Sequence, residues 1–264
     1  MGAMELADAV ESLIRSRGAG CAFPVNIGVN EVAAHYSPSK DDDIRFVLGD
    51  VVKIDVGAHV DGYPADTSTT VEIGTRNNSA LIACADDALR MCIEMTAPGT
   101  AVSVLGDAVS RTIRAAGFRP IENLTGHSME RYSLHAGLSI PNIPTRDRAV
   151  IHEGMVVAIE PFSTTGGGRV RNDARGNIYR IVRDRRAPPE VTALFSSMRA
   201  AFGTFPFASR WCEALQPGSA SLVQRMVRLG MIMNYPVLTE IQKGIVAQSE
   251  HSVVVTGDGC VVIT

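Results

Sequence analysis

Residues 53–69 have the sequence KIDVGAHVDGYPADTST, a pattern typical of two β-strands joined by a tight turn. The run Val51–Val60 is rich in β-branched residues, and a second such run follows over Thr67–Ile73. Between them stands Asp61-Gly62, a dipeptide that favours the two-residue turns of β-hairpins. The sequence therefore predicts a β-hairpin in this part of the chain.

Two aspartates, Asp55 and Asp66, lie on this hairpin and are predicted to face each other across it. Asp55 is surrounded by valine and isoleucine, where a carboxylate stripped of water is very costly unless a cation neutralises it. For either aspartate taken alone, a structural salt bridge is an equally good explanation. The two aspartates together indicate a metal site, provided that the rest of the chain supplies further ligands.

Two glutamates stand in similar contexts. Glu160 follows the apolar run Met155–Ile159, and Glu250 precedes the apolar run Val253–Val255. Both carboxylates are therefore expected beside buried β-structure rather than on a solvated helical face.

The ligand chemistry of this set suits metal ions. Four carboxylates, joined by the imidazole of His127 in the segment LTGHSMERYSLHAGLSIPN, form an oxygen-rich set. Such a set favours two divalent cations of the Mn, Fe, Co or Zn type, which carboxylates can bridge. The five cysteines are scattered without metal-ligand spacing, which argues against a structural zinc site. The sequence predicts a metal-dependent hydrolase.

Six sequence segments between about Ala22 and the C-terminus resemble the motifs of one protein family and occur in the same order. They are AFPVN, AAHYSP, KIDVGAHVDGYPADT, GHSMERYSLHAGLSIPN, AIEPF and QSEHSVVV. The chain resembles the methionine aminopeptidases, and most of all their type 2 class in its archaeal form. The resemblance implies an α/β (α+β) "pita-bread" fold with two pseudo-twofold symmetric halves around a metal cleft. It also implies a cytoplasmic enzyme that removes the initiator methionine from nascent chains with a small second residue.

The resemblance assigns each metal ligand a role. Asp66 and Glu250 are expected to bridge two divalent ions, Asp55 to complete one site, and His127 with Glu160 to complete the other. A water or hydroxide between the ions is the implied nucleophile, since two cations lower the pKa of bound water. Glu160 is expected to relay its proton to the leaving amine.

Five further residues match substrate-contacting positions of the family. His35 and His135 are expected to flank the scissile bond as catalytic, substrate-binding residues, with His135 able to hydrogen-bond the substrate carbonyl oxygen. Phe23, Leu134 and Tyr235 match positions that line the methionine side-chain pocket, although residues of these types are also common in cores. No family role maps onto His59 or His152, and strand alternation predicts that His251 points away from Glu250.

Helical patterns place these motifs on a scaffold. Amphipathic spacing predicts helices over Met4–Ser16, Asn78–Thr96 and Val102–Ala116. Residues 1–264 are expected to form a single catalytic domain, with residues 187–240 as an inserted helical subdomain. An insertion between the last two metal-ligand segments is the feature that the resemblance assigns to the type 2 class.

The charge and hydropathy of the sequence argue against nucleic acids and membranes as binding partners. A net charge of −3 with a pI near 6.1 gives no general attraction to nucleic acid, so no specific nucleic-acid ligand is expected. A basic n-region, an apolar leader and an 18-residue apolar run are not seen, so no membrane association is expected. Nascent polypeptide N-termini are the expected partners, and the ribosome is a possible one.

Two other functions stay open at this point. A proline-specific peptidase of the same fold would share the five ligands, but such relatives carry a large N-terminal domain before the metal half. A non-catalytic pita-bread protein that binds RNA or ribosomes is the second alternative, although such proteins lose ligands that this chain keeps.

Overall fold

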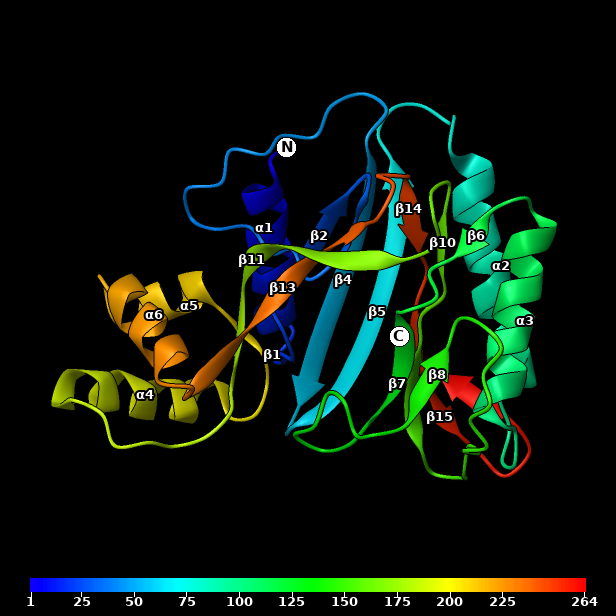
Figure 1. Ribbon diagram of the computed structural model, residues 1–264. Helices are drawn as coiled ribbons and strands as arrows, with labels where there is room; N and C mark the ends of the chain where they lie inside the picture. The colour runs from blue at the N-terminus through cyan, green and yellow to red at the C-terminus, as the bar shows by residue number, and fades with distance from the viewer.

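The computed structural model describes residues 1–264, and the hairpin expected from the sequence lies at its centre (Figure 1). Strands β4 (Val51–Val60) and β5 (Tyr63–Glu72) pair antiparallel over their full length. Positive φ angles of 50° at Asp61 and 85° at Gly62 form the turn between them. The Asp-Gly dipeptide therefore marks a real hairpin turn.

The register of the hairpin corrects one expectation. Asp55 lies opposite Ser68, and Asp66 lies opposite Gly57, so the two aspartates are diagonal neighbours rather than a directly facing pair. Because successive residues of a strand alternate between faces, both carboxylates still lie on the same face of the hairpin. Gly57 leaves room for the ring of Phe23, which a Cβ at that position would hit.

The rest of the first half packs against this hairpin. Strands β1 (Gly20–Cys21) and β2 (Asn26–Val29) both pair with β4. Helix α1 (Ala3–Ser16) begins one residue before its predicted start and contributes Ala3 and Ala7 to a buried cluster with Val25, Ile27 and Val52.

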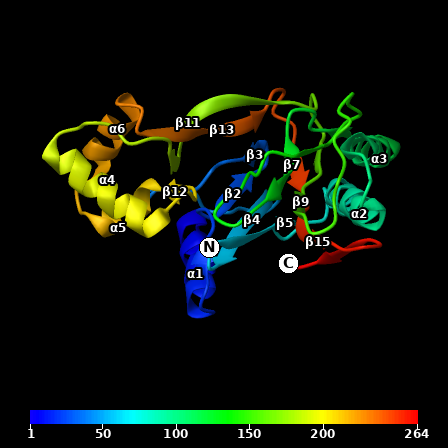
Figure 2. The same cartoon turned by 90° about the horizontal axis from the view of Figure 1, so that it is seen from below.

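The second half is a five-stranded sheet covered by two helices. Its strand order is β16 (Cys260–Val262), β15 (His251–Val255), β9 (Val156–Ile159), β7 (Thr125–Met129) and β8 (Ser139–Pro141). Helices α2 (Ser79–Met95) and α3 (Val102–Ala115) lie beside this sheet and share its largest apolar cluster (Figures 1 and 2). Both helices match the predicted ones to within one residue at each end.

Two smaller sheets complete the strands. One contains β14 (Val246–Gln248), β10 (Phe162–Thr164) and β6 (Arg119–Pro120). The other contains β12 (Phe207–Ala208), β11 (Val170–Ile181), β13 (Ile232–Glu240) and β3 (Val32–Ala34). The long pair of β11 and β13 runs across the molecule toward three further helices (Figure 2).

Those three helices lie between β11 and β13 in the chain. They are α4 (Pro189–Phe202), α5 (Ser209–Leu215) and α6 (Ala220–Arg228), which stand apart from α2 and α3 on the opposite side of the molecule (Figure 1). Eleven buried residues, among them Phe195 and Met226, give them an apolar cluster of their own. The range 187–240 also includes strand β13, and its independence as a subdomain stays a prediction.

A buried polar cluster joins these helices to the first half. Glu11 of α1, whose side chain is 2% exposed, forms an ion pair with Arg210 and accepts hydrogen bonds from Trp211 Nε1 (2.8 Å) and Val25 N (3.3 Å). Arg210 Nη1 also donates to Ser37 Oγ at 2.7 Å. One carboxylate therefore holds α5 against α1 and β2.

Hydrogen bonds join strand β5 to residues 248–252 of the second half. Asp66 N donates to Ser252 Oγ at 2.8 Å, and Thr67 Oγ1 donates to the carbonyl oxygen of Glu250 at 2.8 Å. Thr70 Oγ1 donates to the carbonyl oxygen of Gln248 at 2.6 Å. We call this set of contacts the seam, and it places carboxylates of both halves side by side. Across the whole fold, no helix combines the length and apolar character that a membrane span needs.

Candidate functional site

A cavity of about 330 Å³ lies where the halves meet. Nineteen residues line it, and they include all ten residues that the sequence singled out: Phe23, His35, Asp55, Asp66, His127, Leu134, His135, Glu160, Tyr235 and Glu250. These residues are spread over more than 220 positions of the sequence, so the fold alone brings them together.

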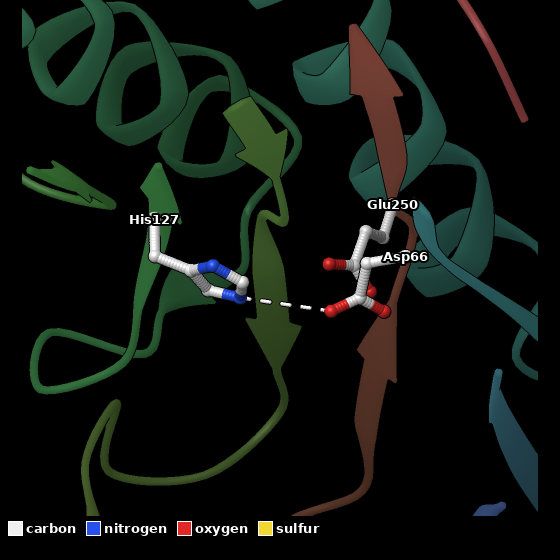
Figure 3. Close-up of side chains that lie close together, drawn as sticks. All are labelled: Asp66, His127 and Glu250. Carbon is white, nitrogen blue, oxygen red and sulfur yellow. Dashed lines mark ion pairs between the residues drawn. The ribbon is translucent and has the colours of Figure 1, made fainter. Parts of the chain in front are cut away.

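Three of them form the centre of the site. Ligand atoms of Asp66, His127 and Glu250 all lie within 4.8 Å of one another, and all three residues are buried. His127 extends from β7, and its Nε2 lies 3.6 Å from Asp66 Oδ2 (Figure 3). Oxygen and imidazole donors converge here at the spacing that a bound cation would need.

The other two predicted ligands adjoin this centre. Glu160 Oε1 lies 3.8 Å from His127 Nε2, and Asp55, whose pKa burial raises, is close enough to Asp66 for the charge of Asp66 to raise that pKa further. Gln248 donates from Nε2 to Glu160 Oε2 at 3.4 Å and to Glu250 Oε2 at 3.3 Å. The sequence reasoning missed Gln248, although its place two residues before Glu250 on an extended segment was a usable signal.

Burial and mutual repulsion make the charged form of the four carboxyls unfavourable in this site. Burial raises the pKa of all four carboxyls, and the charge of Asp66 adds to the rise at Asp55, Glu160 and Glu250. The pKa of Asp66 itself is raised to about 7. Buried Asp55 Oδ1, Asp66 Oδ1 and His127 Nδ1 have no hydrogen-bond partner in the protein. Divalent cations fit this set, because they neutralise the carboxylates and use their free oxygens.

Burial keeps the cavity histidines neutral. It lowers the pKa of His35, His127 and His135 to about 4 each, and proximity between His127 and His135, whose ring centroids are 4.3 Å apart, adds to this at His135. At neutral pH each ring therefore offers one lone pair and one N–H. His35 also adopts a left-handed backbone with φ of 63°, a conformation often found at functional sites.

Aromatic and aliphatic side chains form one wall of the cavity. Phe23 and Leu134 belong to a buried cluster that also contains Ala22, Met129, Ala158 and Phe205. Tyr235 meets the ring of His35 edge-on at 5.3 Å between centroids. The lining residues Phe162, Ile178, Pro206 and Leu238 were not predicted, because apolar residues of this kind are indistinguishable from core residues in the sequence.

The three remaining histidines do not line this cavity. His59 stacks on Phe205 with ring centroids 4.7 Å apart, and His251 Nδ1 lies 2.9 Å from Thr264 Oγ1. Phe205 itself lies in the Phe23 cluster, and not in the core of the inserted helices, where its neighbours Phe202 and Phe207 stack on each other.

Metal binding is expected to release protons. Because burial raises the pKa of Asp66 to about 7 and those of its three neighbours as well, the metal-free protein holds protons that a cation must displace. Affinity should therefore increase from about pH 6 to about pH 8, with roughly one proton or more released per chain near neutrality. Calorimetric titration in two buffers of different ionisation enthalpy measures this number. A buffer-independent heat would contradict the protonated state of the carboxyls.

Known proteins resemble this chain over nearly its whole length. The profile of Metallopeptidase family M24 matches residues 1–257. A methionine aminopeptidase of Pyrococcus abyssi is 43% identical over 99% of this chain and 90% of its own length. The methionine aminopeptidase of Methanocaldococcus jannaschii is 40% identical over 99% of this chain and 88% of its own.

Solved structures share the fold. A thermophilic Arx1 has a TM-score of 0.85 at 19% identity, covering 100% of this chain and 83% of that one. A methionine aminopeptidase of Thermotoga maritima has a TM-score of 0.71 at 20% identity, covering 99% and 84%. The pita-bread fold expected from the motifs is confirmed, and the chain belongs to metallopeptidase family M24.

Proposed function

We propose that the protein is a methionine aminopeptidase of the type 2 class, which removes the initiator methionine from nascent chains with a small second residue. The observation that carries the proposal is the convergence of ten predicted residues on one cavity, with four carboxylates and three histidines beside an apolar wall. Full-length relatives that are 40–45% identical bear the name methionine aminopeptidase.

Divalent metal belongs to the chemistry of this metallopeptidase family, and the buried carboxylates fit it. We propose two ions of the Mn, Fe, Co or Zn type, with Asp66 and Glu250 as bridging ligands. Asp55 would complete one site, and His127 with Glu160 the other. When bound, such ions supply Lewis acidity that lowers the pKa of water and stabilises charge on the carbonyl oxygen of the substrate.

The side chains around the ligands handle protons and orientation. A carboxylate oxygen of Glu160 accepts the proton of the attacking water and returns it to the amine that leaves. Neutral His135 donates its N–H to the carbonyl oxygen of the scissile bond, where negative charge develops. Neutral His35 contacts the scissile peptide on the side away from His135. Its own backbone conformation and the edge-on contact with the Tyr235 ring hold it in place.

The apolar wall would receive the methionine side chain. Phe23, Leu134 and Tyr235 surround a space that suits an unbranched thioether, and methionine sulfur is attracted to aromatic rings. In such pockets one misfitting methylene costs about 1–3 kcal/mol, so β-branched and charged first residues are refused. The second residue lies between the carboxylates and the histidines, which requires it to be small.

Peptide selectivity tests the proposal. The metal-loaded protein should cleave a Met-Gly peptide at least roughly tenfold faster than Leu-Gly and Met-Lys peptides of equal length, as judged by kcat/KM. Equal cleavage of all three would identify a broad aminopeptidase. Cleavage restricted to peptides with proline in second place would favour the proline-specific alternative instead.

The cytoplasm and the ribosome are the proposed setting, since initiator methionine is removed from emerging chains. The segment 169–228, which includes all of β11 and all three inserted helices, contains eleven arginines and four acidic residues, while the whole chain has a net charge of −3. This concentration of positive charge suits transient contact with RNA phosphates near the substrate. The complete ligand set argues against a purely non-catalytic role.

A further inference from the structure

The edge of the cavity carries an arginine that the proposed chemistry does not use. Ile178 of β11 and Tyr235 of β13 are cross-strand partners, and both line the cavity. Two residues further on each strand, Arg180 pairs with Met233. Because side chains alternate along a strand, Arg180 and Met233 extend the cavity-lining face outward, and both are exposed. We call this pair the rim.

The guanidinium of Arg180 has hydrogen-bond donors and a positive charge that no acidic side chain of the protein uses. Its Nε donates to Met233 Sδ at 2.9 Å, a weak acceptor, and no carboxylate lies within ion-pairing distance of it. Some arginines of the same region are paired, as Arg199 is with Asp184 at 3.4 Å. Arg180 is therefore an unneutralised charge held in place by a neighbouring side chain.

Arg180 also acts on the cavity electrostatically. Burial raises the pKa of Tyr235, and the positive charge of Arg180 acts in the opposite direction. The charge of Arg180 therefore reaches Tyr235, which lines the cavity and contacts the substrate in the proposed function. A peptide that leaves the cavity past Tyr235 passes this charge.

The order of the subsites follows from the proposed function, on which this inference rests. The first residue fills the apolar wall and the second lies against the carboxylates and histidines, so the third is the first residue to reach the opening. We propose that Arg180 forms a subsite for an acidic third residue, so that the enzyme favours nascent chains with Asp or Glu at that position. The rim supplies a cation, and Met233 supplies an apolar surface for the acidic side chain's methylenes.

Three amidated pentapeptides test the subsite on the metal-loaded full chain: Met-Ala-Glu-Gly-Gly, Met-Ala-Gln-Gly-Gly and Met-Ala-Lys-Gly-Gly. Amidation removes the terminal carboxylate as a competing anion. We expect kcat/KM for the Glu peptide to exceed that for the Lys peptide by roughly threefold to tenfold at low salt, mostly through KM, and the ratio to shrink at high salt. Arg180→Gln should bring the ratio to about one, and Arg180→Glu should invert it.

Arg183→Glu is the matched control. Arg183 is also exposed and outside any ion pair, and it lies three residues further along the chain, where its Nε donates to the carbonyl oxygen of Gly230. This variant changes the net charge equally and should keep the preference for the Glu peptide. Equal loss of the preference in both variants, or its persistence in Arg180→Glu, would overturn the subsite. Equal cleavage of all three peptides by the unmodified protein overturns the subsite alone, whereas no cleavage of any overturns the proposed function as well.

Discussion

Asp66→Ala is expected to abolish peptide cleavage and to remove bound metal in the same step. Asp66 lies 3.6 Å from His127, and its charge acts on the carboxyls of Asp55, Glu160 and Glu250, so its loss removes a donor that adjoins all the others. Loss of a residue that only supports a metal ligand typically costs about 10–100-fold in affinity or activity, and loss of a shared ligand should cost far more.

Two measurements on the same preparation check this result. Elemental analysis after dialysis gives the metal content, and cleavage of a Met-Gly peptide gives the activity. His35→Ala is the matched control, because it also lines the cavity but offers no ligand in the proposed scheme: activity should fall roughly a hundredfold while metal content is kept. Full activity of metal-supplemented Asp66→Ala would refute the proposed ligand set.

Glu11→Ala is expected to destabilise the protein by about 3–5 kcal/mol, because it leaves a buried guanidinium without its counter-charge. The side chains of Arg210 and Glu11 are only 6% and 2% exposed, and Trp211 Nε1 loses its acceptor as well. Urea denaturation followed by Trp211 fluorescence measures the change in the free energy of unfolding. Asp8→Ala, an exposed site on the same helix, should change it by less than about 0.5 kcal/mol.

A double variant separates charge from packing at this position. Replacing both Glu11 and Arg210 by Met removes the unpaired charge and should recover much of the lost stability. A double variant that is no more stable than Glu11→Ala would mean that the loss comes from the contacts with Trp211 and Val25 instead.

Local chemistry was enough to predict the hairpin that carries Asp55 and Asp66, and the two helices that cover the sheet of the second half. The Asp61-Gly62 dipeptide predicted the turn of the hairpin, since few other sequences adopt two consecutive positive φ angles. Helical periodicity predicted α2 and α3 to within a residue because one face of each is buried in a continuous core. The exact pairing of Asp55 with Ser68 depends on turn length counted residue by residue, which the wrong expectation of facing aspartates overlooked.

Long-range contacts limited what could be predicted of the site. Family motifs pointed to ten of the nineteen lining residues, but the hydrogen bonds that Gln248 gives to two glutamates exist only after β14 packs into the molecule. Phe205 and Phe207 are only two residues apart in the sequence, yet their side chains belong to different apolar clusters. The type of an apolar side chain predicts that it is buried. Which apolar cluster it joins depends on the tertiary fold.

The seam affects how the protein folds during its synthesis. Its three hydrogen bonds join residues 178–186 positions apart, so the hairpin with Asp55 and Asp66 emerges from the ribosome long before Glu250 is made. At about 5–20 residues per second, this interval lasts roughly ten seconds or more. Throughout it, β5 has an open edge where Ser68 will later meet Glu250, and such edges invite wrong pairing. Slow synthesis would prolong this exposed stage, and a chaperone that covers β5 would raise the yield of active protein.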